Sequence, residues 1–268
     1  MVNLIIKTFK RYAWFKRFNA KITYELLAKF VPAEDWHFMN YGYEPNAEEA
    51  SLQLKEKVLQ RYPLQMYHYL AMKTPLVNKD VLEVGSGRGG GAHYLAGAMS
   101  PNSYVGLDLA QSAVDLANKI HQQPNLKFIQ GSAEEIPLES NSVDVIVNVE
   151  SSHCYGSVDM FLSEVKRVLK PKGYLLMVDF RNEVKNMERF QEQIKNSGLK
   201  LVQEENISKN VMAAIEAENP VKVKRIEELI PKRWQKLFSD FAGVVGSRFY
   251  NTLKDGTRVY YRFVLQKA

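Results

Sequence analysis

Short apolar segments alternate with longer mixed segments between residues 80 and 180 of this 268-residue chain. The apolar segments have the length and β-branched content of buried strands, and the mixed segments between them have the character of helices. The expected strands are 80–84, 104–107, 126–130, 143–149 and 173–179, and the expected helices are 90–99, 110–121 and 159–169. Strands that alternate with helices predict right-handed βαβ crossovers and a doubly wound, mostly parallel α/β sheet.

The pattern changes on both sides of this region. Residues 1–75 are expected to be helical, with breaks at Pro32 and around 41–45, and to form an N-terminal lid that caps the substrate. Residues 76–268 are expected to form the main domain, in which 206–241 is a helical substrate lid.

The C-terminal third is expected to complete the sheet. Its predicted elements are helices at 186–196 and 211–241, the latter broken at Pro220 and Pro231, and an extended segment at 199–206. The segments 244–250 and 259–266, around Asp255-Gly256, predict an antiparallel hairpin.

A glycine-rich turn, Gly85-Ser86-Gly87-Arg88-Gly89-Gly90-Gly91, connects the first expected strand with the first helix. Glycines let the backbone approach a ligand closely, and the helix N-terminus presents free N–H groups. Asp108 ends the second strand, where a carboxylate accepts hydrogen bonds from ribose hydroxyls. This pattern is compatible with two cofactors, a nicotinamide dinucleotide and S-adenosylmethionine (SAM).

Three features favour SAM over the dinucleotide. Glu83 precedes the glycines, where a carboxylate could hold a cationic amino-acid group. Residues 131–137 (GSAEEIP) follow the third strand and supply a polar turn for an adenine. The expected C-terminal hairpin is antiparallel.

Composition and charge narrow the function classes. Residues 1–30 carry seven basic side chains and one acidic side chain, which equals the whole net charge of +6. The near-neutral remainder argues against a nucleic-acid-binding surface, and no Asn-Pro-Pro-Tyr/Phe tetrapeptide follows the fourth strand. The basic, aromatic N-terminus could contact a membrane surface or simply pack on its own domain.

No apolar run is long enough to span a bilayer and no secretory signal is visible, so a cytoplasmic location is expected. The single cysteine, Cys154, excludes a multi-cysteine metal site. The histidines lack metal-ligand spacing, and we expect no metal.

The segments VLEVGSGRGGG, YVGLDLA, GSAEEIPLESNSVDVIVNVESSHCY and EVKRVLKPKGYLLMVD resemble the class I SAM-dependent methyltransferases. They are similar to the small-molecule branch that includes ubiquinone/menaquinone, sterol and tocopherol methyltransferases. The closest likeness is to the phthiotriol/phenolphthiotriol dimycocerosate methyltransferases, which O-methylate a lipid hydroxyl. The resemblance implies a Rossmann-like, seven-stranded sheet with SAM as the cofactor. The implied SAM contacts are Glu83, Gly85, Gly87, Asp108, Leu109, Ser132, Ala133 and Asn148, with Tyr41 and Gln65 as further candidates from the N-terminal lid. The segment 38–43 (FMNYGY) resembles the aromatic-glycine segment that helps to close the site over SAM in the sterol and tocopherol relatives. Many relatives have an aspartate where this chain has Ser132, which implies a weaker side-chain contact with the adenine.

Glu150, Ser151, Ser152 and His153 follow the fourth strand and are expected at the ligand crevice. His153 is the candidate general base because its pKa lies near neutrality, although it could instead be a structural residue of the loop. Glu150 is expected to orient His153 or contact SAM, and a buried carboxylate with a raised pKa could itself accept a proton. The candidates for an apolar acceptor pocket, which could equally be core residues, are Trp234, Phe238, Phe241, Phe249 and Tyr250.

The sequence therefore predicts methyl transfer from SAM to a hydroxyl or nitrogen of an apolar small molecule, either a lipid or another natural product. C-methylation of a quinone or sterol-like ring is an alternative. A catalytically silent SAM-binding scaffold is the alternative outside enzymes.

Overall fold

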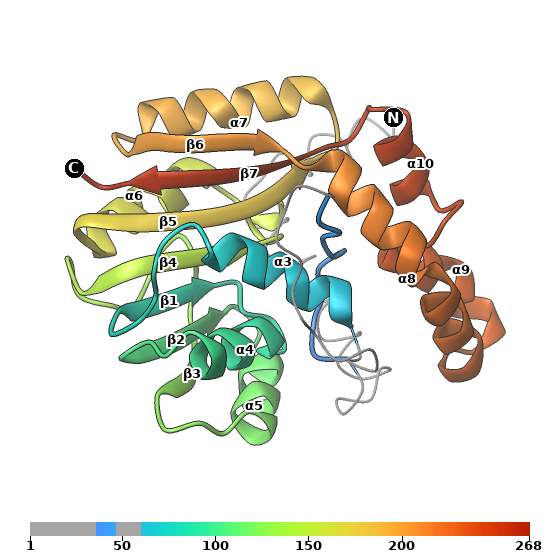
Figure 1. The fold of residues 1–268 in the computed structure, drawn as a ribbon, viewed down its shortest axis with the longest axis horizontal. Coiled ribbons are helices and arrows are strands. Elements are labelled where there is room, and N and C mark those ends of the chain that lie inside the picture. Colours follow the sequence, from blue (N-terminus) through green and yellow to red (C-terminus); the bar gives the residue numbers. More distant parts are fainter. Residues whose placement is uncertain (1–35, 47–59) are drawn as a thin grey trace, which may run out of the picture.

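The computed structural model describes residues 36–46 and 60–268. Seven strands form one sheet in the order β3-β2-β1-β4-β5-β7-β6 (Figure 1). The strands are β1 (Asp80–Val84), β2 (Ser103–Asp108), β3 (Leu126–Gln130), β4 (Val143–Val149), β5 (Leu169–Arg181), β6 (Lys200–Asn206) and β7 (Val259–Gln266). The first five strands pair in parallel, and β7 pairs antiparallel to both β5 and β6. The predicted mixed, mostly parallel sheet is confirmed.

Helices cover both faces of the sheet. They are α3 (Arg61–Ala71), α4 (Gly90–Ala98), α5 (Gln111–Ile120), the 3₁₀ turn η2 (Ser152–Cys154), α6 (Val158–Val168), α7 (Val184–Asn196), α8 (Ser208–Leu229), α9 (Lys232–Ala242) and α10 (Arg248–Lys254). Apolar side chains of α3, α4, α5, α8 and α10 form one core, whereas those of α6 and α7 form the other. Because β4 lies between two layers, six of its seven residues are buried, as its continuous apolar sequence predicts.

Two elements of the C-terminal third differ from the prediction. Residues 244–250 do not form a strand, because Gly243 and Gly246 have positive φ angles (65° and 87°) and Ser247 caps helix α10 by accepting a hydrogen bond from Tyr250 N at 3.2 Å. The antiparallel partners of β7 are therefore β5 and β6. Helix α8 runs through Pro220, which is exposed together with Glu216, so water can hydrate the carbonyl oxygen that loses its intrahelical partner. The predicted break at Pro231 does separate α8 from α9.

The N-terminal part is described only in pieces. Residues 36–46 have no regular secondary structure, and helix α3 follows the second gap. The basic segment 1–30, for which a membrane contact was considered, lies outside the described residues, as does most of the predicted helical lid.

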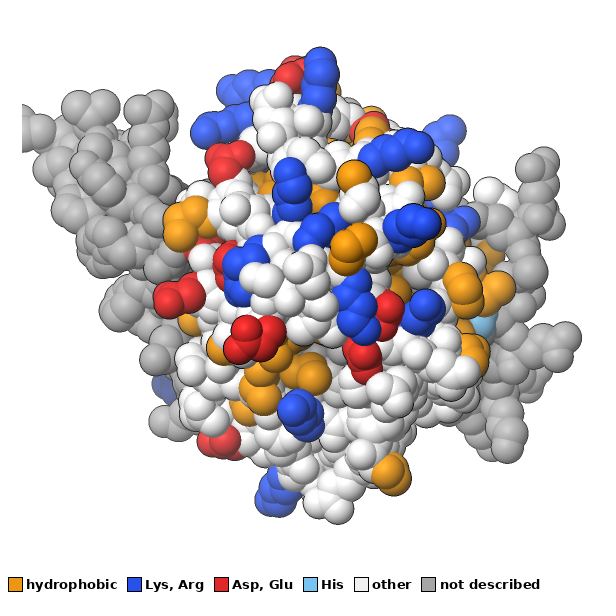
Figure 2. Space-filling view, turned by 90° about the vertical axis from the view of Figure 1, so that its left-hand side faces the viewer, with side chains coloured by type: hydrophobic (Ala, Val, Ile, Leu, Met, Phe, Trp, Pro, Cys, Tyr) orange, Lys and Arg blue, Asp and Glu red, His pale blue; other side chains and the backbone are white. Residues whose placement is uncertain are grey.

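The side of the molecule from which the parallel strands start carries basic, acidic and apolar side chains in mixture (Figure 2). Over the described part of this side, the basic side chains do not merge into one continuous surface. Within residues 36–46 and 60–268, no helix is both long and apolar enough to cross a membrane, and no three His, Cys, Asp or Glu side chains are grouped to hold a metal ion.

Candidate functional site

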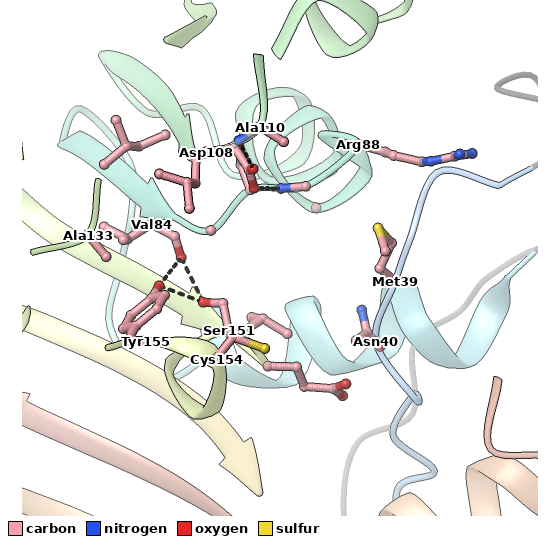
Figure 3. Close-up of a pocket in the computed structure, with 18 of the residues that line it drawn as sticks. Met39, Asn40, Val84, Arg88, Asp108, Ala110, Ala133, Ser151, Cys154 and Tyr155 are labelled. Carbon is pink, nitrogen blue, oxygen red and sulfur yellow. Dashed lines mark hydrogen bonds between the residues drawn. The ribbon is translucent and has the colours of Figure 1, made fainter. Parts of the chain in front are cut away.

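A cavity lies at the carboxyl ends of β1, β2 and β4, and residues 37–40 form its opposite wall (Figure 3). It contains about 990 Å³ of empty space, part of which is open to solvent. The predicted site residues that line it are Gly85, Gly87, Asp108, Leu109, Ser132, Ala133 and Glu150. The sheet topology thus brings together the ends of separate strands at the crevice expected of a doubly wound fold.

The glycine turn forms the floor of this cavity. Gly85 and Gly87 have positive φ angles of 78° and 53°, which residues with side chains rarely adopt. A Cβ atom on Gly85 would lie 2.4 Å from Ser151 Oγ. At Gly87 it would meet only Met39 Sδ within 4 Å, at 3.6 Å, and would project into open space. The absent side chain at Gly87 therefore leaves room for a ligand.

Asp108 is held at the end of β2 by two backbone amides. Its Oδ2 accepts a hydrogen bond from Gly87 N at 2.7 Å, and its Oδ1 accepts one from Ala110 N at 2.9 Å (Figure 3). Burial raises the pKa of Asp108, while these amides lower it. Each carboxylate oxygen can still accept a hydrogen bond from a donor in the cavity.

The turn after β3 provides a second polar wall. Ser132 Oγ accepts a hydrogen bond from Glu134 N at 3.2 Å, and Glu134 Oε1 accepts one from Ser157 N at 2.9 Å. Glu134 therefore connects this turn to the start of helix α6 while lining the cavity itself.

Three predicted contacts lie behind the cavity wall. Glu83 is fully buried, and its carboxylate accepts hydrogen bonds from Tyr67 Oη at 2.8 Å and Tyr104 Oη at 2.9 Å. Burial raises the pKa of Glu83 to about 7. Asn148 donates to Val84 O at 2.8 Å, and Gln65 accepts from Arg61 Nε at 3.0 Å. The structure does not bring these three side chains into the cavity, because each is engaged in the packing behind it; their direct contact with a cofactor stays a prediction.

Glu150 lies where the cavity meets the N-terminal segment. Its Oε1 accepts a hydrogen bond from Tyr41 N at 2.9 Å, and its φ angle of 49° is unusual for a residue with a side chain. Burial raises the pKa of Glu150 to about 7, although the Tyr260 hydroxyl and the Tyr41 amide lower it. At neutral pH this carboxyl is therefore divided between its protonated and ionised forms.

Tyr41 itself faces away from this cavity. Its hydroxyl donates to Phe241 O at 2.9 Å, and its ring stacks on Phe249 with a centroid distance of 3.7 Å. Burial raises its pKa. The predicted cofactor contact through the Tyr41 side chain therefore does not match its position, which is in the lid packing.

His153 points to a different side of the loop from Glu150. Its Nδ1 lies 2.8 Å from Asp179 Oδ1, and it lines a separate polar cavity with Arg181. Burial lowers the pKa of His153, but Cys154 and Asp179 together raise it to about 10. A protonated imidazole cannot accept a proton, so this geometry argues against the predicted general-base role and favours the structural alternative. Asp179 is fully buried and also contacts Arg181 Nη1 at 3.3 Å.

A second cavity adjoins the first. The two share Phe38, Met39 and Asn40 in their walls, and the second is otherwise lined by the N-terminal segment, the start of helix α3 and helices α8 and α9. Its apolar lining residues include Trp36, Val221, Ile226, Phe241 and Ala242.

The aromatic candidates for the acceptor pocket separate into two groups. Phe241 lines the second cavity. The others do not line a described cavity: Phe238 and Phe249 are buried in packing, Tyr250 Oη donates to Glu216 Oε1 at 2.6 Å, and Trp234 is 40% exposed. For these four, the alternative of core or surface positions fits the structure better than the acceptor pocket.

Several cavity residues were not among the individual contacts predicted from the sequence. Met39, Asn40 and Arg88 line the cavity, as does Tyr155, whose hydroxyl lies 2.8 Å from Ser151 Oγ (Figure 3). Arg88 lies in the glycine turn and Tyr155 follows the fourth strand. Both positions are close to strand ends, so the sequence could have identified them as cavity residues. Met39 and Asn40 belong to the segment 38–43, which the resemblance implied would help to close the site over SAM.

Comparisons with known proteins agree with this arrangement. Residues 82–177 match a family model described as a methyltransferase domain. The chain is 31% identical over 274 residues to the fatty-acid O-methyltransferase of Mycolicibacterium smegmatis, covering 99% of this chain and 97% of that protein. It is 33% identical over 244 residues to the phthiotriol/phenolphthiotriol dimycocerosates methyltransferase of Mycobacterium leprae, covering 91% of this chain and 90% of that protein.

Solved structures share the fold. The [4+2]-cyclase SpnF superposes with a TM-score of 0.69 and 18% identity, covering 91% of this chain and 94% of that one. A putative sarcosine dimethylglycine methyltransferase from Galdieria sulphuraria gives the same score and identity, covering 86% and 93%.

Proposed function

This chain belongs to the SAM-dependent methyltransferases, and we propose that it transfers the methyl group to a hydroxyl oxygen of a long, largely apolar acceptor. The observation that carries the proposal is the apolar second cavity beside the first, with Glu150 at their junction. Glu150 lines the first cavity and binds the backbone of Tyr41, which lines the second.

The described residues fit SAM as the cofactor. The open space above Gly87 and the carboxylate of Asp108 suit a ribose with two hydroxyl donors, and Ser132 and Ala133 suit the adenine. When bound, SAM supplies an electrophilic methyl group on a sulfonium.

The second cavity suits the apolar part of the acceptor. Its wall combines aromatic and aliphatic side chains from the N-terminal segment and the α8–α9 lid. Two relatives with lipid acceptors in their names support the same chemistry. Phe38, Met39 and Asn40 line both cavities, so an acceptor held in the second cavity would reach the methyl group in the first beside these residues.

Glu150 is the proton acceptor in this proposal. Its pKa of about 7 is high enough to take a proton from a reacting hydroxyl and low enough to be ionised in part of the molecules at neutral pH. The hydroxyl proton would move to a Glu150 carboxylate oxygen as the oxygen–methyl bond forms and the methyl–sulfur bond of SAM breaks, which would leave a neutral ether, S-adenosylhomocysteine and a protonated Glu150.

The test is methyl transfer from radiolabelled SAM to a panel of acceptors. We expect product with a long-chain secondary alcohol and little with a short alcohol or a long-chain amine. A protein that binds SAM but methylates no member of the panel would contradict the proposal and favour the silent scaffold.

A further inference from the structure

Exposed apolar side chains are concentrated on the α8–α9 lid. Among the described residues, eleven large hydrophobic side chains are exposed, and five of them lie between residues 221 and 245. They are Val221 (52% exposed), Leu229 (40%), Trp234 (40%), Leu237 (59%) and Val245 (43%). In Figure 1, α8 and α9 project beyond the carboxyl ends of the parallel strands, away from the sheet. Single exposed hydrophobic side chains are common on protein surfaces, but a group of them usually marks an interaction site.

Basic side chains are interleaved with these apolar ones. Residues 221–248 contain seven Lys or Arg and three Asp or Glu, whereas the chain after residue 30 is neutral as a whole. On α9, Lys232, Arg233 and Lys236 are exposed beside Trp234 and Leu237, while Phe238 and Ala242 face the interior. A helix with one buried face, exposed Trp and Leu, and several cations has the character of an interfacial helix.

The same surface continues to the mouth of the second cavity. Val221 is half exposed and also lines that cavity. Lys222 and Arg225 line it as well; Lys222 Nζ lies 3.0 Å from Glu218 Oε2, and the Arg225 guanidinium lies 6.0 Å from the Trp36 ring centroid. An apolar molecule that leaves a surface in contact with α9 would therefore meet the cavity at Val221, between the basic side chains of Lys222 and Arg225.

We propose that this lid surface, formed by Val221, Leu229, Trp234, Leu237, Val245 and the basic residues between them, docks on an anionic lipid surface. The inference rests on the proposed function, because it explains how a poorly soluble acceptor reaches the second cavity. Exposed Trp and Leu enter the interface between headgroups and acyl chains, and the cations bind the anionic headgroups. The positive charge among the apolar residues favours a lipid surface over a second copy of this chain, whose own lid would repel it.

The experiment measures partition of the full chain onto vesicles of phosphatidylcholine with and without phosphatidylglycerol. Leu237→Ser is compared with Leu201→Ser, a change of the same kind at a residue that is 43% exposed on β6. We expect Leu237→Ser to weaken partition onto the anionic vesicles by about tenfold and Leu201→Ser by less than about twofold. Lys236→Glu is compared in the same way with Lys195→Glu on α7, and only the former should weaken binding.

Equal binding to neutral and anionic vesicles, or equal binding by Leu237→Ser and the parent, would overturn the proposal. In the second case another segment, or a protein partner, would be responsible for any attachment. Because partition is measured without acceptor or SAM, its result is independent of catalysis. Vesicle binding that depends on Leu237 in a protein without methyl transfer would sustain the docking surface and refute the proposed function.

Discussion

Replacing Glu150 with glutamine tests the reaction chemistry most directly. The change keeps the size of the side chain and an oxygen that can accept the hydrogen bond from Tyr41 N, which is 2.9 Å long in the parent. It removes only the ability to take up a proton. Because a positioned general base contributes roughly 10²–10⁴-fold, kcat with a hydroxyl acceptor should fall by that factor, equivalent to about 3–5 kcal/mol in the barrier. The affinity for SAM, measured by calorimetry, should change little.

The dependence of activity on pH gives a second test of Glu150 as the base. Burial raises the pKa of Glu150 to about 7, and only the ionised carboxylate accepts a proton, so the activity of the parent should rise with pH through about 7. Glu150→Gln should lose this limb. Glu83 is the matched control because its buried carboxyl also has a pKa of about 7 but does not line the cavity. Glu83→Gln should retain the limb, whatever its effect on SAM affinity or stability.

A fatty-acid acceptor gives the opposite expectation. Its carboxylate is already ionised at neutral pH and needs no base, and an ionised Glu150 would repel it. Glu150→Gln should therefore leave kcat/KM for a fatty acid unchanged or raise it. Equal losses with the alcohol and the fatty acid, or an unchanged pH limb in Glu150→Gln, would refute the assignment of Glu150 as the base.

Three further predictions concern the cofactor wall and the neighbouring ion pair. Asp108→Ala should weaken SAM binding in calorimetry by about 1.5–3 kcal/mol, through loss of a charged acceptor; unchanged affinity would exclude Asp108 from the site. Gly85→Ala should lower the free energy of unfolding by at least about 1 kcal/mol because its Cβ would lie against Ser151 Oγ at a positive φ angle. Gly97→Ala in helix α4 should change it by less than about 1 kcal/mol in the same denaturation assay, because its Cβ would meet only the end of the Gln123 side chain, at 3.1 Å, which can shift. Asp179→Asn should cost about 3–5 kcal/mol of stability by leaving buried cations unpaired. Because the folded-state pKa of His153 is raised to about 10, the stabilisation by this pair should be complete below the unfolded pKa near 6.5 and should be lost as pH rises towards 10.

The parts of the site that follow directly from a strand could be predicted from the sequence. Gly85, Gly87, Asp108 and the turn at Ser132 all stand at the ends of strands that the hydrophobic pattern identifies, and all line the cavity. A parallel sheet places such ends on one edge whatever the details of packing. Local pattern was therefore sufficient to bring these residues to one cavity, whereas Glu83 and Asn148, which were predicted from the same strands, lie behind its wall.

The hydrophobic pattern could not predict which way the side chains after the fourth strand point. Glu150 and His153 are three residues apart, yet the turn at 152–154 directs one to the first cavity and the other to Asp179. The pKa of each also depends on residues remote in sequence, and neither periodicity nor spacing contains that information. The segment 244–250 was misread as a strand for a related reason: its apolar pattern did not reveal that two glycines with positive φ and a serine cap favour a helix.

The two buried acids next to this loop illustrate how the fold separates a structural from a reactive carboxyl. Asp179 lies within 3.3 Å of both His153 and Arg181 nitrogens, and although burial raises the pKa of Asp179, these cations lower it further than burial raises it. Among the described residues, no Lys or Arg forms an ion pair with Glu150, so burial dominates there and the pKa rises to about 7. Pairs of acids whose environments move their pKa values apart are the usual basis of acid–base roles in enzymes. His153, the base suggested by the sequence, thus keeps Asp179 ionised and paired, whereas Glu150 has the raised pKa that the proposed proton transfer requires.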